Sequence, residues 1–187
     1  MLLILQFDFG KEDNLMSKRT RVFMVFAIIF TILSLAVATV ATVKEIVFDM
    51  NCTQYIKRAA DANTVELAKD ELEKAISYAE EEDLTEGIVS IFLHQPQNDI
   101  GFWYNNMKEA YSELENLPEE ATPLEKTNVL MKLRESLTDE TDSGISVTMP
   151  SGISLYPYNA MYFWIGIIFF IFAIAFWTEF AIFHYDD

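Results

Sequence analysis

Two long uncharged apolar runs constrain what this chain can fold into. Val22 to Val43 holds 22 residues without a charge, and 13 of them are Val, Ile, Leu or Phe. At helical rise this run is roughly 33 Å long, enough to cross the hydrocarbon core of a bilayer. A second uncharged run covers 160–178, and we expect its helix to extend to 183. We therefore predict transmembrane helices at 22–43 and 160–183, since buried core helices usually have apolar runs of only about 10–14 residues.

Basic residues beside the first run predict the orientation in the membrane. Lys18, Arg19 and Arg21 lie directly before it, and Lys and Arg are enriched on the cytoplasmic side of transmembrane helices. We expect a two-pass protein of a bacterial inner (plasma) membrane, with both termini in the cytoplasm; the opposite orientation is the alternative. The expected segments are a cytoplasmic segment 1–21, transmembrane helix 22–43, an extracytoplasmic domain 44–159 that is periplasmic or extracellular, transmembrane helix 160–183 and a cytoplasmic tail 184–187.

The start of the chain allows two alternatives. The first run resembles a signal peptide in position, but it is longer than the usual apolar core of about 7–15 residues and no clear cleavage site follows it. We therefore expect an uncleaved anchor. Translation starts either at Met1 or at Met16, and in the second case residues 1–15 are an upstream extension with no fold of their own.

The segment 44–159 is strongly acidic. It carries 23 acidic and 9 basic residues, and such a surface repels nucleic acid and anionic lipid headgroups. We therefore expect no nucleic-acid partner. The charge suits cationic partners, divalent ions or simply solubility beside a membrane. Cys52 is the single cysteine, so the chain has no internal disulfide framework.

Apolar residues at helical spacing predict that this segment is mostly helical, with three helices beyond the extension of the first span. Asn63 followed by Glu66 has the pattern of a capping box, as does Thr122–Pro123 followed by Glu125, and Asp99 is an expected N-cap. The expected core positions are Val65, Ala68, Leu72, Ala75 or Ile76, and Ala79 in the first helix, Phe102, Trp103, Met107, Ala110, Tyr111 and Leu114 in the second, and Leu130, Leu133 and Leu137 in the third.

Two short stretches predict strands. Residues 88–93 are β-branched or aromatic, which favours a strand. Ile145, Val147 and Met149 alternate with polar residues, and a second alternation follows at 153–155. We expect these two alternating stretches to pair as a hairpin around 150–152. The predicted fold class is thus a mainly α membrane protein, with two transmembrane helices flanking a mostly helical extracytoplasmic domain that has a few short strands.

No pattern of residues specifies a metal site, a cofactor or a reaction. His94 and His184 are expected on opposite sides of the membrane, and no Cys or His spacing resembles a zinc site. Asp139–Gly144 resembles the opening of an EF-hand loop, but Pro150 stands where the twelfth, bidentate ligand would be. No nucleophile motif or phosphate-binding loop is present. We therefore predict a protein that is not an enzyme and has no metal, cofactor or catalytic residues.

Small residues recur along the first predicted span. Helices associate in lipid by close packing at such residues, so we expect a packing seam in the membrane. The strip either packs against the second span of the same chain or docks another protein or a second copy. The expected packing residues are Ala27, Thr31, Ser34, Ala38 and Ala41 on the first span and Gly166 and Ala173 on the second.

The stretch from Gly101 to Asn106 is dense in aromatic and amide side chains. At helical spacing Phe102, Trp103 and Met107 are expected in the core. The alternative is that Trp103 or Tyr104 lines a small-ligand pocket or anchors a partner, because aromatic residues serve both roles.

The run Cys52–Thr–Gln–Tyr–Ile–Lys–Arg–Ala–Ala–Asp–Ala–Asn–Thr–Val–Glu–Leu–Ala68 resembles a segment of an uncharacterised bacterial family of small two-span membrane proteins. That resemblance implies a membrane location and brings no activity with it. The layout of span, helical segment and span also resembles the sensor half of chemoreceptors and histidine kinases. Few residues follow the second span, so we expect any signal to pass to another protein.

Two functions fit these observations. We prefer a non-enzymatic accessory or scaffold subunit, embedded in the lipid bilayer, whose extracytoplasmic domain and small-residue seam bind a membrane-protein partner or another copy of the chain. The alternative is a ligand-sensing membrane protein that signals through a separate partner and binds its ligand near Trp103 and Tyr104.

Overall fold

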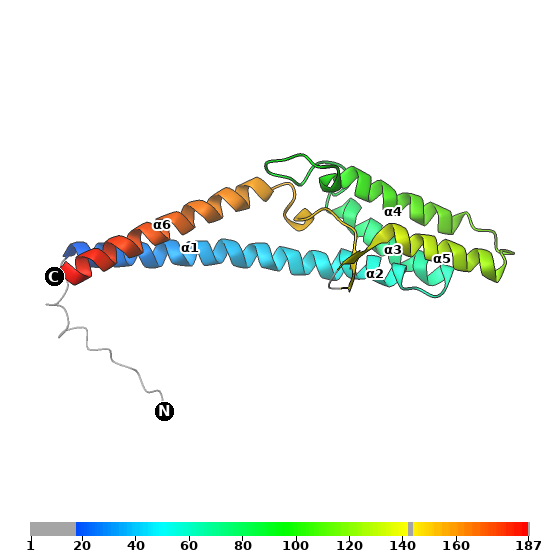
Figure 1. Ribbon diagram of the computed structural model, residues 1–187, viewed down its shortest axis with the longest axis horizontal. Coiled ribbons are helices and arrows are strands. Elements are labelled where there is room, and N and C mark those ends of the chain that lie inside the picture. The colour runs from blue at the N-terminus through cyan, green and yellow to red at the C-terminus, as the bar shows by residue number, and fades with distance from the viewer. Residues whose placement is uncertain (1–17, 142–143, 187) are drawn as a thin grey trace, which may run out of the picture. The chain divides into compact units, whose positions relative to one another are not determined.

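The computed structural model describes residues 18–141 and 144–186 and is mainly helical (Figure 1). The helices are α1 (Lys18–Phe48), α2 (Gln54–Ala60), α3 (Val65–Glu81), α4 (Ile100–Glu115), α5 (Pro123–Leu137) and α6 (Asn159–Asp186), with a π-helical turn η1 (Asp49–Thr53) and 3-10 turns η2 (Pro96–Asn98) and η3 (Ile153–Leu155). Strands β1 (Thr138–Thr141) and β2 (Gly144–Val147) form one antiparallel pair. The chain divides into two compact units. We call residues 18–40 and 161–186 the helix pair, and 41–160 the helical domain.

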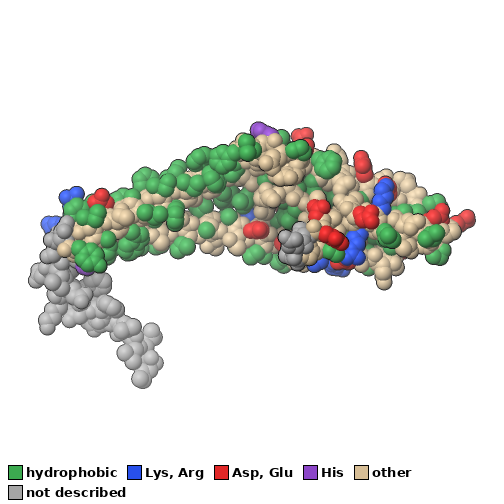
Figure 2. All heavy atoms as spheres, in the orientation of Figure 1, with side chains coloured by type: hydrophobic (Ala, Val, Ile, Leu, Met, Phe, Trp, Pro, Cys, Tyr) green, Lys and Arg blue, Asp and Glu red, His purple; other side chains and the backbone are tan. Residues whose placement is uncertain are grey.

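The two helices of the pair are long and apolar enough to cross a membrane. The backbone stays helical from Lys18 to Ala60, and the second helix runs from Asn159 to Tyr185. Only 6% of the most apolar window of each helix is buried, and Figure 2 shows hydrophobic side chains over the surfaces of α1 and α6. As the sequence predicts, the first helix does not end at Val43. Apolar side chains exposed along a whole helix are typical of a segment whose surroundings are lipid.

The core of the helical domain is built on the predicted apolar stripe of α3. Every position of that stripe is buried, from Val65 through Leu72 to Ala79, while the charged positions between them are mostly exposed. The stripe packs against α2 and α4, where Ile56 and Met107 are fully buried. Burying a side chain such as Leu72 contributes about 1.5–3 kcal/mol, so this stripe stabilises the domain.

Side-chain caps define where three of the domain's helices begin. Asp99 accepts a hydrogen bond from the Phe102 amide at 3.0 Å, which confirms the predicted N-cap of α4. Thr122 and Glu125 form a reciprocal capping box at α5, which is also confirmed. The prediction for α3 is wrong by one residue. Thr64, in an extended conformation, is the cap and accepts from Leu67 at 3.2 Å; β-branched residues favour that conformation.

The strand predictions need correction. Residues 88–93 form no strand, and the segment makes one isolated bridge, between Ile88 and Asp99. The predicted pairing of 145–149 with 153–155 is also wrong. β2 pairs instead with β1, in the register Asp139 to Ser146, and 153–155 is the 3-10 turn η3. Gly152 has a positive φ of 82° and hydrogen-bonds Leu155 and Asn159, so the chain turns too tightly there for a second strand to form.

A close contact at Gly87 holds the loop that precedes α4. Gly87 has a φ of 118°, and a Cβ at this position would clash with the hydroxyl of Tyr156. Its carbonyl accepts the Ile100 amide at 2.9 Å, and the Val89 amide donates to Asn98 at 3.0 Å. These bonds fix the loop from both ends and thereby position the first turn of α4.

Candidate ligand cavity

The helical domain contains a cavity of about 680 Å³, a size typical of small-molecule sites. It lies between the loop before α4, the first two turns of α4, and the strand pair with the segment that follows it. The lining residues are Pro96, Gln97, Asn98, Asp99, Phe102, Trp103, Asn106, Asp139, Ser146, Val147, Thr148, Met149, Pro150 and Ser151.

The strand side of the cavity is fixed by bonds to the end of α5. The Thr148 amide donates to the Leu137 carbonyl at 2.9 Å, and the Thr148 hydroxyl donates to Asp139 Oδ2 at 2.8 Å. From α4, Asn106 Nδ2 donates to the Ser136 carbonyl at 2.9 Å. The Asn106 bond joins α4 to the end of α5, and the two Thr148 bonds hold the segment after β2 to the end of α5 and to β1. The cavity is therefore part of the folded domain rather than a gap between loose loops.

Of the two aromatic residues singled out in the sequence, only Trp103 lines this cavity. It is 5% exposed and packs near Phe48, with ring centroids 6.4 Å apart. Its Nε1 is buried and has no hydrogen-bond partner among the described residues.

Tyr104 faces α3 instead. Its hydroxyl donates to Glu80 Oε1 at 2.6 Å, and Lys108 Nζ donates to the same oxygen at 3.2 Å. The two hydrogen bonds lower the pKa of Glu80, and the bond to Glu80 raises the pKa of Tyr104. Tyr104 is not part of the cavity lining, so of these two aromatic residues only Trp103 lies at the site. Tyr104 stabilises the α3–α4 contact.

Phe102 corrects a prediction and adds a residue to the site. The sequence predicts it in the core, but its side chain is 70% exposed and lines the cavity. Trp103 and Met107 take the core positions of α4 instead. The sequence contains no clear signal for this exposure, because Ile100 in the same first turn of α4 is fully buried.

The charge in the cavity is negative. Asp99 and Asp139 are the two charged residues of the lining, which includes no Lys, Arg or His. Both carboxylates already accept a hydrogen bond, from the Phe102 amide and the Thr148 hydroxyl. The cavity thus offers an apolar surface beside two acidic groups, with amide and hydroxyl side chains between them.

Two other titratable groups of the domain, Cys52 and Glu71, are buried. Cys52 is fully buried beside the Ala75 carbonyl, and burial raises the pKa of its thiol to about 12, so it is not a reactive thiolate. Glu71 is buried and binds Arg58 at 2.9 Å and Lys74 at 3.0 Å. The ion pair between Arg58 and Glu71 joins α2 to α3.

Metal binding has no support from the described part of the chain. Residues 18–141 and 144–186 contain no group of three or more His, Cys, Asp or Glu side chains that would hold a metal ion. The segment that resembles an EF-hand opening, Asp139–Gly144, includes residues 142 and 143, which lie outside the described residues.

In the helix pair, some of the predicted small residues lie where α1 meets α6. Ala27 and Ala173 are buried. Thr31 accepts a hydrogen bond from Trp177 Nε1 at 3.1 Å and donates to the Ala27 carbonyl at 2.7 Å. A Cβ on Gly166 would contact Val37 at 3.7 Å. Of the remaining predicted positions, the half-buried ones are Ser34 and Ala41, and the exposed one is Ala38.

Phenylalanine rings contribute more to this contact than the sequence suggested. Phe30 lies 5.1 Å from Phe172 and 5.5 Å from Phe176, measured between ring centroids. Phe23 stacks on Phe183 at 5.6 Å. Phenylalanine is so frequent in both apolar runs that its spacing alone does not distinguish a packed ring from one that faces outward.

Comparison with known proteins finds no relative of this chain. No protein family model, curated protein or solved structure matches it. The resemblance of residues 52–68 to a family of small two-span membrane proteins therefore stays a prediction. The function must be argued from the geometry of the chain itself.

Proposed function

We propose that this chain is a two-pass protein of a bacterial inner membrane whose helical domain lies outside the cytoplasm and binds a small ligand. It catalyses no reaction, and a separate membrane partner responds to the bound state. The observation that carries this proposal is the cavity at Trp103 and Phe102, which combines a size suited to a small molecule, an exposed aromatic ring and two carboxylates.

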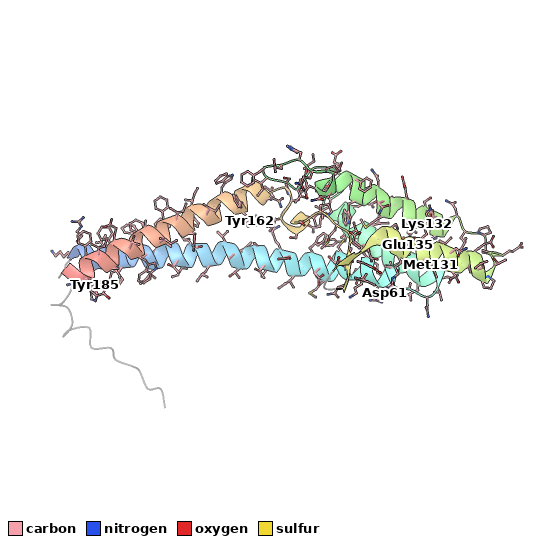
Figure 3. The ribbon with its side chains drawn as sticks, in the orientation of Figure 1. Asp61, Met131, Lys132, Glu135, Tyr162 and Tyr185 are labelled. Carbon is pink, nitrogen blue, oxygen red and sulfur yellow. The ribbon has the colours of Figure 1, made fainter. Side chains whose placement is uncertain are left out.

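The two ends of the helix pair support the membrane topology. Lys18, Arg19 and Arg21 gather at the start of α1, as expected of a cytoplasmic end, and the Arg19 guanidinium lies 4.0 Å from the centre of the Phe183 ring. Tyr162 and Tyr185 lie near opposite ends of α6 (Figure 3). Tyrosines at both ends of an apolar helix are typical of the two membrane interfaces.

The lining of the cavity favours binding over catalysis. It contains hydroxyls at 146, 148 and 151 but no histidine or lysine to act as a base, and a hydroxyl nucleophile needs such a base. Its two carboxylates are each held by a hydrogen bond from the protein. A site of this kind can orient a ligand without activating it.

Phe102 allows a direct test, because its side chain is 70% exposed and lines the cavity. In the full chain in mild detergent, Phe102→Ala should change the free energy of unfolding by less than about 0.5 kcal/mol. It should nevertheless abolish the rise in melting temperature that a bound ligand causes in the unmodified protein. The assay is a thermal-stability screen against a broad panel of metabolites.

Leu124→Ala is the matched control. Leu124 is 69% exposed, as Phe102 is, but it lies on α5 and does not line the cavity. This variant should keep the full ligand response. If no panel member stabilises the unmodified protein, or if Phe102→Ala keeps the response, the cavity is not a ligand site.

An accessory or scaffold role is the second candidate function. Leu124 and Met131 are exposed and lie seven residues apart on one face of α5, and Figure 3 shows Met131 beside Lys132 and Glu135. This face offers a surface to a membrane-protein partner or a second copy. Met131→Glu should release such a partner, and native mass spectrometry of the detergent-extracted complex would detect the loss. A monomer without bound protein would speak against this role.

A further inference from the structure

We propose that the cavity takes an amphipathic organic cation, namely an amine or quaternary ammonium group carried on an apolar or aromatic body. This inference rests on the proposed function and adds the chemical class of the ligand to it. It follows from the exposed apolar side chains of the lining, from the sign of the charges in the lining and from the position of the two carboxylates.

The apolar body of the ligand would be held by aromatic and aliphatic side chains. Phe102 exposes 70% of its side chain at the cavity, Trp103 adds the edge of its buried ring, and Val147 and Met149 lie in the opposite wall. Covering an exposed phenylalanine removes apolar area from water, which favours binding by about 25 cal/mol for each Å² covered. The cavity therefore selects a ligand with an apolar part.

The charge of the lining selects a cation. Asp99 and Asp139 face no Lys, Arg or His within the lining, so an anionic ligand would meet two like charges and no cationic side chain. The beginning of α4, where an anion would otherwise bind, is already occupied, because Asp99 accepts the Phe102 amide at 3.0 Å. A positively charged group near these carboxylates gains attraction from both.

The aromatic rings favour an organic cation over a metal ion. A cation close to the face of Phe102 is attracted by the ring's electrons, and this attraction is greatest where the cation is weakly hydrated. Each carboxylate keeps only part of its acceptor capacity, since Thr148 donates to Asp139 and the Phe102 amide to Asp99. Calcium needs six to eight oxygen ligands, which two bonded carboxylates do not provide.

Fluorescence of Trp103 gives the test. The chain has three tryptophans, so the double variant Trp164→Phe, Trp177→Phe leaves Trp103 as the single reporter in the full-length protein. The probes are 2-phenylethylammonium, 2-phenylethanol and phenylacetate, which share a body and differ in charge. We expect saturable binding of the ammonium probe alone, weakening as salt is raised.

Neutralising the carboxylates should weaken that binding. Asp99→Asn keeps an N-cap, and Asp139→Asn keeps an acceptor for Thr148. Each should raise the dissociation constant of the ammonium probe roughly two- to fivefold, as expected for a solvent-accessible charge pair. Glu109→Gln removes an exposed carboxylate of α4 outside the cavity and should leave the constant unchanged.

The outcomes separate this inference from the proposed function. Equal binding of 2-phenylethanol or phenylacetate would show that the cavity binds ligands but does not select cations, which overturns the inference alone. The same holds if no probe binds while another member of the metabolite panel stabilises the protein in a Phe102-dependent way. Absence of binding by every probe and every panel member overturns both.

Discussion

The helix pair and the helical domain use apolar residues in opposite ways. In α1 and α6 the apolar side chains are spread around the helix and mostly exposed, and the buried positions at the contact include small residues such as Ala27 and Ala173. In α3 most apolar residues form one buried stripe, Leu67 is exposed, and most of the remaining residues are charged. This difference indicates that the helical domain is stabilised by burial of apolar side chains through the hydrophobic effect. The contact between α1 and α6 depends instead on close packing.

Removing a core side chain from the domain should have the largest effect. Leu72 is fully buried on α3, and Leu67 on the same helix is exposed. We expect Leu72→Ala to lower the free energy of unfolding by about 2–5 kcal/mol and Leu67→Ala by less than about 0.5 kcal/mol. Urea denaturation of the full chain in detergent measures both, followed by Trp103 fluorescence in the Trp164→Phe, Trp177→Phe background. Similar losses for the two variants would mean that the stripe is not the core.

Enlarging a small residue should affect the pair but not the domain. Ala27 is buried against α6 and Ala36 is exposed. Ala27→Leu should separate α1 from α6, since overpacking typically costs about 1–3 kcal/mol, while Ala36→Leu should be neutral. The readout is disulfide formation between cysteines placed at Val37 and Gly166 in a Cys52→Ala background. Unchanged cross-linking in Ala27→Leu would show that close packing at Ala27 does not hold the pair.

The capping box of α5 gives a smaller, local effect. Thr122→Ala removes the acceptor for the Glu125 amide and should cost about 1 kcal/mol. Thr127 on the same helix donates to the Pro123 carbonyl without capping anything, so Thr127→Ala should change stability less. The urea concentration at the unfolding midpoint, measured for both variants, should be lower for Thr122→Ala than for Thr127→Ala. Equal midpoints would show that the cap does not stabilise α5.

The smallest effect expected is a pH dependence at the α3–α4 contact. Hydrogen bonds from Tyr104 and then Lys108 lower the pKa of Glu80 below its ordinary 4.5. A depressed folded-state pKa contributes stability above the unfolded pKa, and this contribution is lost as the pH falls through the folded value. Tyr104→Phe should raise the pKa of Glu80 and reduce the loss of stability below pH 4.5. An NMR titration of the Glu80 carboxyl measures the shift; an unchanged pKa would contradict the role of Tyr104.

The sequence predicted what depends on regular spacing. The apolar stripe of α3, the long helices α1 and α6, and the caps at Asp99 and Thr122 each follow from patterns within a few turns of one helix. These features are local, so a single sequence contains the information that determines them. The domain's three helices were expected for the same reason.

What the sequence did not predict depends on contacts between distant residues. The cavity forms because β1 pairs with β2 and brings Asp139 and Met149 to the first turns of α4. Alternation in 145–149 indicates a strand but not its partner, and the preceding polar segment has no strand signal. Phe102 was placed in the core for a related reason, since helical spacing gives two faces and only tertiary packing decides which is buried.

The central claim, a helical domain held outside the cytoplasm by two membrane-spanning helices, is tested most directly by thiol labelling in intact bacterial cells. In a Cys52→Ala background, single cysteines replace Ser112 on α4 and His184 near the end of α6, both of which are exposed. The account predicts that a membrane-impermeant maleimide labels position 112 in intact cells and position 184 only after the membrane is opened. Labelling of 184 alone in intact cells, or of neither position before opening, would contradict it.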